Sequence, residues 1–441
     1  MPGAARSRDG VPRLKRPAVL LKSFPPLLFL LLLTGCGPGV PAGTPASAPA
    51  AGVTATRTDW PLPATGVAAQ PDLVVAPDGR VLLSWIAAEP GGLHVLRFAA
   101  FDGRTWSAPQ EIARGDDWFV NWADTPHIAA TEDGALWAHW LRRSAAATYA
   151  YDVVLSRSGD GGSTWSNALP VNDDGTPTEH GFVSLWPQSP TTIGVAWLDG
   201  RNTAGGDHAG HDGHGAGAMA LRAATVDSAV QKSAETEIDA YTCDCCQTSA
   251  AITDRGPLLV YRGRDAKEIR DIVATRLQDG AWTSPRKVHD DQWTMPACPV
   301  NGPQVAARGA QAWVAWYTAA GDMPQLRIAY SGDAGDRFAA PVEIDRGQAM
   351  QGRVGIAVDD ASVWVSWVRE DPQGQSLWLA RYPPDLSREL QRLQVATLQG
   401  RGRATGFPQL VAANGGVYIT WTDAVDSKPQ LQGARIALNP M

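Results

Sequence analysis

Short runs of alternating apolar and small or polar residues recur along the chain, and one such run is found seven times between residues 81 and 421. Each copy follows a turn that contains Gly or Asp, and each ends in Trp or Tyr. The copies are residues 81–85, 136–140, 193–197, 257–261, 312–316, 363–367 and 417–421. Alternation with a period of two is typical of β-strands. The pattern therefore predicts an all-β chain.

The spacing of these runs indicates the size of the repeating unit. Their final aromatic residues lie 55, 57, 64, 55, 51 and 54 residues apart, which is room for one four-stranded antiparallel sheet per repeat. Sheets repeated radially form the blades of a β-propeller. We predict a single propeller domain over residues 58–441, with seven blades favoured and six as the alternative. The last repeat holds only about three strands, so we expect residues 58–63 to supply its outer strand and to close the ring.

The first 57 residues differ in composition from the repeats. A basic stretch ends at Lys22, an apolar run follows over residues 25–33, and residues 33–36 read Leu-Thr-Gly-Cys. This order resembles the lipobox of bacterial lipoproteins, in which the chain is cleaved before the Cys and its thiol carries a lipid. The resemblance implies a signal peptide over 1–35, lipidation of Cys36 and anchoring to a membrane of the bacterial cell envelope on its extracytoplasmic side; an ordinary secretory signal is the alternative. The Pro, Ala and Gly of residues 36–57 predict a flexible tether.

Charge and composition exclude several classes of protein. The chain has 45 Gly, 33 Pro and 18 Trp, which does not suit a helical bundle. Without residues 1–35 it keeps 32 basic and 44 acidic residues, a balance that repels nucleic acid. No phosphate-binding Gly-rich loop and no His-Glu-x-x-His motif occurs in the sequence. We expect a monomer that does not bind nucleic acid.

A second motif follows several of the aromatic residues by about 17–20 positions. Residues 158–165 and 331–338 are full copies, and 101–106 and 278–282 are shorter ones. In such a hairpin turn Asp accepts turn amides, Gly supplies a positive φ, and an aromatic closes the turn against the sheet. The motif resembles the Asp box, or BNR repeat, of sialidase-like propellers. The resemblance implies that these turns are structural and that the chain is an exo-glycosidase-type hydrolase acting on an acidic or polar glycan, or on another small polar substrate, without a required cofactor.

The topology of a propeller blade sorts the remaining residues onto two faces. In an up-and-down blade with strands A to D, the D–A connectors and the B–C loops lie on the same face, opposite the C–D turns. Counting 18 residues back from each aromatic end reaches the connectors at Trp122, Glu179, Cys243, Cys298, Ala349 and Arg403. These connectors are rich in polar groups, so we expect the functional site on this face.

The resemblance to sialidases implies three kinds of site residue: arginines on a substrate carboxylate, a Tyr nucleophile activated by Glu, and an Asp acid/base. The candidate catalytic residues on this face are Asp124, Tyr149, Tyr151, Glu179, Glu268 and Asp271. The candidate substrate-binding residues are His180, Arg201, Arg262, Arg270, Asn301, Arg353 and Arg403. For each of them the alternative is a solvated loop residue or an ion pair between blades.

Four cysteines remain after Cys36, and all of them fall in two neighbouring connectors: Cys243, Cys245, Cys246 and Cys298. Since Cys243 and Cys298 hold equivalent positions in adjacent repeats, we expect them to lie close in space. One interpretation is one or two disulfides, as suits an oxidising compartment. The other is a copper or zinc site made by all four, helped by the His-rich insertion at residues 207–214. A non-catalytic propeller that binds glycan or protein, and a metal-binding envelope protein, therefore stand beside the hydrolase.

Overall fold

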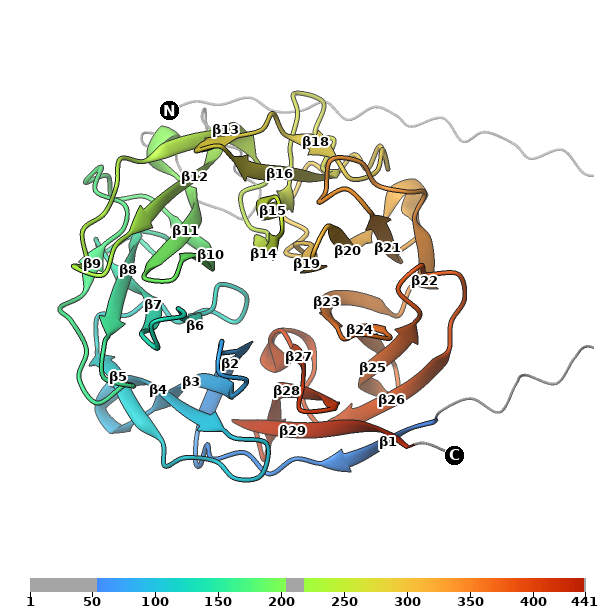
Figure 1. Cartoon of the computed structure of the whole chain (residues 1–441), viewed down its shortest axis with the longest axis horizontal. Helices are drawn as coiled ribbons and strands as arrows, with labels where there is room; N and C mark the ends of the chain where they lie inside the picture. The colour runs from blue at the N-terminus through green and yellow to red at the C-terminus, as the bar shows by residue number, and fades with distance from the viewer. Residues whose placement is uncertain (1–53, 204–217, 440–441) are drawn as a thin grey trace, which may run out of the picture. The chain divides into compact units, whose positions relative to one another are not determined.

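The computed structural model describes residues 54–203 and 218–439, which form seven antiparallel sheets around a ring (Figure 1). The prediction of an all-β propeller is confirmed, with seven blades rather than six. Neighbouring inner strands contact one another all the way around, from β2 through β6, β10, β14, β19, β23 and β27 back to β2. In residues 54–203 and 218–439, none of the helices is long and apolar enough to cross a membrane.

The strands follow in blade order. Blades one to three comprise β2 (Ala68–Val75), β3 (Val81–Ala88), β4 (His94–Phe101) and β5 (Gln110–Gly115); β6 (Ile128–Ala130), β7 (Leu136–Arg143), β8 (Tyr151–Ser158) and β9 (Leu169–Pro170); and β10 (His180–Ser189), β11 (Thr192–Asp199), β12 (Met219–Val226) and β13 (Thr236–Thr242). Blade four comprises β14 (Ser249–Thr253), β15 (Gly256–Arg262), β16 (Ile272–Gln278), β17 (Ala281–Trp282) and β18 (Arg286–Lys287).

Blades five to seven complete the ring. They comprise β19 (Gln304–Arg308), β20 (Gln311–Thr318), β21 (Gln325–Ser331) and β22 (Val342–Arg346); β23 (Met350–Val358), β24 (Val363–Asp371), β25 (Gly374–Tyr382) and β26 (Gln391–Leu398); and β27 (Gln409–Ala413), β28 (Gly416–Val425), β29 (Lys428–Asn439) and β1 (Thr54–Asp59). Within the described residues, four short 3₁₀ turns interrupt the loops: η1 (Pro90–Gly92), η2 (Arg201–Thr203), η3 (Ala320–Asp322) and η4 (Gly402–Thr405).

The seven recurring runs are the second strands of the blades, namely β3, β7, β11, β15, β20, β24 and β28. These strands are buried on both faces because each blade packs against two neighbours, which explains why their sequences are apolar almost throughout. The indoles of Trp197, Trp316 and Trp367 are fully buried. The core is thus a series of apolar layers between blades, for example Leu82 of β3 with Trp140 of β7.

The ring is closed by the N-terminal strand, as expected, but the predicted boundary was wrong. Strand β1 pairs antiparallel with β29, from Thr54 opposite Asn439 to Asp59 opposite Ala434 (Figure 1). The strand therefore includes residues 54–57, which we had assigned to the tether. It ends before Pro61 and Pro63, because proline has no N–H to give to a ladder.

The hairpin turns of the second motif have the expected internal bonds. Asp160 accepts hydrogen bonds from the backbone N–H of Thr164 at 2.9 Å and from its hydroxyl at 2.7 Å. Ser158 Oγ accepts from the N–H of Gly162 at 2.8 Å. This turn joins the third and fourth strands of blade two, and the turn at residues 331–338 does the same in blade five. Both belong to the face opposite the D–A connectors.

Candidate functional site

The six counted positions all lie in D–A connectors. Trp122 precedes β6, Glu179 precedes β10 and Arg403 lies in η4, before β27. Cys243, Cys298 and Ala349 precede β14, β19 and β23. The connector face is therefore organised as the repeat spacing predicts.

A polar cavity lies at the centre of the ring. It has a volume of about 200 Å³ and is lined by segments of all seven blades, which is room for about six water molecules. Its walls include Asp72, Asp124 and His127. The two carboxyl side chains are almost completely buried, so each needs a proton or a partner.

Three of the predicted catalytic residues meet beside this cavity. The Tyr151 hydroxyl, at the start of β8, lies 3.0 Å from Asp124 Oδ2 and 2.8 Å from Glu179 Oε1. A phenol has a single proton to donate, so it can bond to both carboxyls only if one of them donates its own proton in return. The ring of Phe119 stacks on Tyr151 with centroids 3.9 Å apart. We call Asp124, Tyr151 and Glu179 the carboxyl–tyrosine cluster.

Burial dominates the acid–base properties of this cluster. Burial raises the pKa of Glu179 to about 8; the bond from Tyr151 opposes the shift, and the charges of Asp124 and Asp244 add to it. Burial also raises the pKa of Asp124 to about 7, against the bonds from the Phe182 amide and Tyr151 and the charge of His127. The pKa of Tyr151 is raised well above its usual value by burial and by the two carboxyls. Two carboxyl groups that change protonation near neutral pH suit proton transfer.

These shifts predict how stability depends on pH. The folded chain keeps protons on Asp124 and Glu179 that the unfolded chain releases above about pH 4. The stabilisation from these protons is complete below that pH and is lost as the pH rises through about 7 and 8. Between pH 6 and pH 9, we expect the melting temperature of the wild type to fall by about 3 °C more than that of Glu179→Gln. Circular dichroism melts would measure it, with exposed Glu132→Gln as the control; identical pH slopes in wild type and Glu179→Gln would contradict it.

Asp72 is a cavity residue that the sequence reasoning missed. Its Oδ2 accepts the N–H of Ile128 at 2.9 Å, and its Oδ1 lies 3.1 Å from His127 Nδ1. Burial lowers the pKa of His127, but the charges of Asp72 and Asp124 and the bond to Asp72 more than offset this, and the net shift is upward. The available signal was a carboxylate inside an otherwise apolar strand, in Gln70-Pro71-Asp72-Leu73-Val74.

Most of the predicted arginine clamps are held by the protein itself. Arg262 donates to the carbonyl oxygens of Arg270, Asn301 and Tyr317. Arg353 donates to Thr405 Oγ1 and to the carbonyl oxygens of Gly402 and Gly406. A substrate carboxylate would have to displace these bonds, so the two side chains act here as braces between connectors.

Other predicted binding residues are also engaged. Arg201 Nη2 lies 2.7 Å from both Asp199 and Glu235. Asn301 Oδ1 accepts the N–H of Arg353 at 2.8 Å. His180 is fully buried, with Nε2 3.0 Å from Asp174. Asp174, His180 and Asp199 could together ligate a cation, but both carboxylates already pair with the Arg201 guanidinium.

Arg403 differs from the other arginines because it is exposed. Among the residues that the structure describes, no carboxylate lies within ion-pair distance of it. Its guanidinium lies over the half-buried Trp122 ring, 5.6 Å from the centroid, and that of Arg353 lies 4.9 Å from the same ring. Burial lowers the pKa of Arg353 to about 10; the charge of Glu370 opposes this and that of Arg403 adds to it. Two cations on one indole favour an anion beside them.

The other three predicted catalytic residues lie outside the carboxyl–tyrosine cluster. Asp271 bonds to Lys287 Nζ at 2.8 Å and to the amides of Gln292 and Trp293, so it fixes a loop. Glu268 pairs with Arg264 and Arg270, next to the cysteines. Tyr149 is 38% exposed and meets the edge of Phe119.

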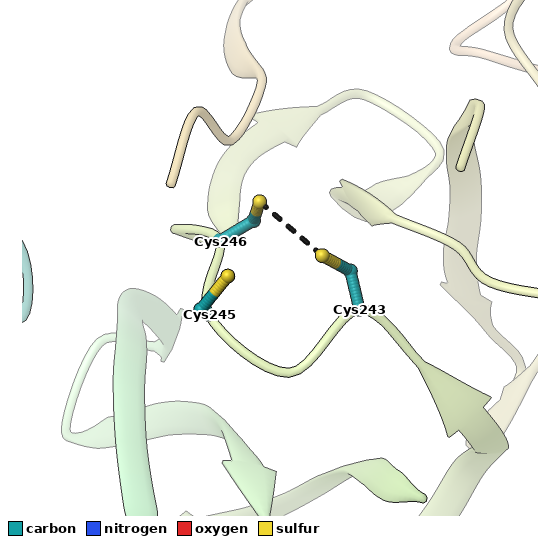
Figure 2. Close-up of side chains that lie close together, drawn as sticks. All are labelled: Cys243, Cys245 and Cys246. Atoms are coloured by element: carbon teal, nitrogen blue, oxygen red, sulfur yellow. Dashed lines mark hydrogen bonds between the residues drawn. The ribbon is translucent and has the colours of Figure 1, made fainter. Parts of the chain in front are cut away.

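Three of the four cysteines come together. Cys243, Cys245 and Cys246 lie in the turn between β13 and β14, and Figure 2 shows their side chains turned toward one another. Their sulfur atoms all lie within 4.8 Å of one another, and those of Cys243 and Cys246 are 3.4 Å apart. The Cys298 thiol, from the next connector, lies close enough to Cys245 to help raise the pKa of that thiol. All four are free thiols in this structure, and we call them the thiol cluster.

Buried arginines surround the thiol cluster. Arg270 is fully buried and donates from Nη1 to Cys243 Sγ at 3.1 Å. Burial alone raises the pKa of Cys243, but bonds from Cys245 and Cys246 and the charges of Arg270 and Arg262 hold it well below its usual value. Burial raises the pKa of both Cys245 and Cys246. The His-rich insertion at 207–214 lies outside the described residues.

Comparisons with solved structures find enzymes of similar fold at low identity. An endosialidase of phage phi92 is 11% identical, with a TM-score of 0.49, over 88% of this chain and 70% of that one. The polysaccharide lyase Uly1 is 9% identical, with a TM-score of 0.49, over 83% and 89%. An α-L-arabinanase of Penicillium chrysogenum is 13% identical, with a TM-score of 0.41, over 83% and 92%. No protein-family model and no curated protein matches the chain.

Proposed function

We propose that the chain is an exported, lipid-anchored, sialidase-like propeller that hydrolyses an acidic glycan by acid–base chemistry at the carboxyl–tyrosine cluster. The observation that carries the proposal is the Tyr151 hydroxyl bridging Asp124, a buried carboxyl that lines the central cavity, and Glu179, a half-buried one. A concave polar site with groups of perturbed pKa is the usual location of catalysis. The export signal and Cys36 would hold the enzyme at the cell envelope.

Each member of the cluster has a distinct role in this proposal. Asp124 lines the cavity, so it donates a proton to the glycosidic oxygen as the bond to the anomeric carbon breaks. Water attacks that carbon and gives up its proton to the Asp124 carboxylate, while Glu179, whose pKa is about 8, holds a second proton behind Tyr151. Tyr151 is fully buried beneath Phe119. We therefore assign Tyr151 the transfer of a proton between the carboxyls instead of the nucleophilic role that the resemblance implied.

The preference for an acidic substrate rests on Trp122 and Arg403. The half-buried indole of Trp122 holds the Arg403 guanidinium on this face by a cation–π contact. The exposed Arg403 guanidinium beside it supplies a charge for a substrate carboxylate. Trp122 is two residues from Asp124 in the same connector, which brings recognition close to the reacting groups.

Turnover of a panel of acidic and neutral glycosides would test the proposal. We expect Asp124→Asn and Tyr151→Phe to lower kcat by about 100-fold or more, and Arg403→Ala to raise KM for acidic substrates only. Tyr382→Phe is the matched control, because its hydroxyl also bonds to a glutamate, Glu389, but in the outer part of blade six. Absence of turnover across the panel, or unchanged turnover in Asp124→Asn, would reject the hydrolase; binding without turnover would indicate a glycan-binding propeller.

A further inference from the structure

The spacing of the sulfur atoms suits a shared metal ion. Zinc–thiolate bonds are about 2.3 Å long, which places neighbouring sulfurs of a tetrahedral site about 3.8 Å apart. The sulfurs of Cys243, Cys245 and Cys246 are already gathered within 4.8 Å, with the shortest separation at 3.4 Å. Cys298, in the connector that leads into blade five, is close enough to Cys245 to affect the pKa of that thiol. Three thiols of one connector are thus gathered in one place, and the thiol of the next connector lies beside one of them.

The charge around these thiols supports an anionic occupant. The side chains of Arg262, Arg264 and Arg270 are all almost fully buried, and they bring three positive charges. Two carboxylates, Asp244 and Glu268, bond to Arg264. One positive charge is left over in a nearly dry region, and buried charge of this kind needs compensation. Disulfides are neutral and would leave it uncompensated, whereas a metal–thiolate complex is negative.

A second observation concerns Arg270 alone. Its Nη1 donates to Cys243 and its Nη2 to Glu268. Its Nε is buried and has no acceptor in the part of the chain that the structure describes. The guanidinium is fully buried, it bonds to a sulfur, and one of its N–H donors has no acceptor. This arrangement fits a site in which the sulfur carries a negative charge.

We propose that Cys243, Cys245, Cys246 and Cys298 bind one thiophilic d¹⁰ cation, Cu(I) or Zn(II), on the connectors that lead into blades four and five. Each sulfur–metal bond forms as the thiol proton leaves to solvent. Two thiolates on Cu(I), or three to four thiolates on Zn(II), give a complex with the net negative charge that the arginines balance. Cys298 is the exposed member, so the ion would exchange through the connector face. The site uses other residues than the proposed hydrolase.

Metal content and thiol number of the full chain test this inference directly. The chain would be isolated from an oxidising compartment without reductant, and the reduced metal-free protein would then be titrated anaerobically with Cu(I) alone and with Zn(II) alone against a competing chelator. We expect one equivalent of at least one ion, protection of the thiols from alkylation, and metal–sulfur distances of about 2.3 Å by X-ray absorption. The two titrations show which ion the site prefers.

Variants separate the metal site from a merely structural cluster. We expect Cys243→Ser and Cys246→Ser each to weaken binding by about 100-fold or more, while Ser84→Ala, an equally buried change in blade one, leaves it unchanged. Cys298→Ser alters an exposed side chain and keeps the test open if a buried variant does not fold. Two disulfides with no metal in the isolated protein would overturn the inference. So would equal metal affinity in the wild type and in the variant with all four cysteines replaced by Ser. None of these measurements depends on glycoside turnover, so the two proposals fail independently.

Discussion

Replacing Gly181 by Ala is expected to destabilise the propeller by about 3 kcal/mol and to break up the carboxyl–tyrosine cluster. A Cβ at this position would lie 1.9 Å from Asp124 Oδ2 and 3.0 Å from Tyr151 Cε2. Asp124 cannot move aside cheaply, because Oδ1 accepts the N–H of Phe182 at 2.7 Å and Oδ2 bonds to Tyr151. The strand and the carboxylate would have to separate, leaving buried polar groups without partners.

Urea unfolding of Gly181→Ala and Gly159→Ala would measure this effect. Gly159 is a matched control because its Cβ would meet only the flexible end of Arg157, at 3.1 Å. We expect little change in the control and, in Gly181→Ala, a lower midpoint together with loss of any turnover. A Gly181→Ala protein as stable as the control would show that Asp124 is not fixed in the way described.

The second large effect is expected at the closure of the ring. Trp60 follows β1 directly, and its ring lies 5.4 Å from Phe101, 4.8 Å from Trp106 and 4.6 Å from Tyr418. These partners belong to blades one and seven, so the indole bridges the first and last blades. We expect Trp60→Ala to lower the free energy of unfolding by about 3–5 kcal/mol.

Trp378→Ala is the comparison for this substitution, because Trp378 is half-buried and stacks on Trp367 within its own blade. We expect it to cost clearly less. Denaturant unfolding followed by intrinsic fluorescence and circular dichroism would measure both proteins. Equal losses of unfolding free energy would mean that the contacts of Trp60 at the ring closure stabilise the fold no more than an indole contact within one blade.

The repeat pattern predicted the ring well because its signal is local. Each aromatic-ended run is buried on both faces, so its composition and spacing are visible in the sequence without any knowledge of the neighbouring blade. The start of β1 was misplaced because its pairing with β29 is set by the far end of the chain. The strand Thr54–Asp59 is mostly exposed, and it has no apolar pattern to mark it.

The site was predicted only in part, for a different reason. Topology placed Asp124, Tyr151 and Glu179 on one face, and they do meet. It gave no information on which guanidinium groups already have partners. Arg353 shows why: it adopts φ 54° at an irregularity in β23, and its side chain reaches across to the η4 connector. Such a contact depends on one residue's backbone conformation and on a loop some 50 positions away, and neither leaves a pattern in the sequence.

The pairing of β1 with β29 also means that the propeller has no obligatory first blade. Strands from the two ends of the described chain are neighbours in one sheet, so the ends could be joined by a short linker and the chain opened elsewhere. Any exposed connector would then serve as a new pair of termini, since chain ends are tolerated at surface loops. Circular permutants cut between other blades should keep the same ring of strands, and they would allow each blade in turn to be attached to a membrane or to a partner.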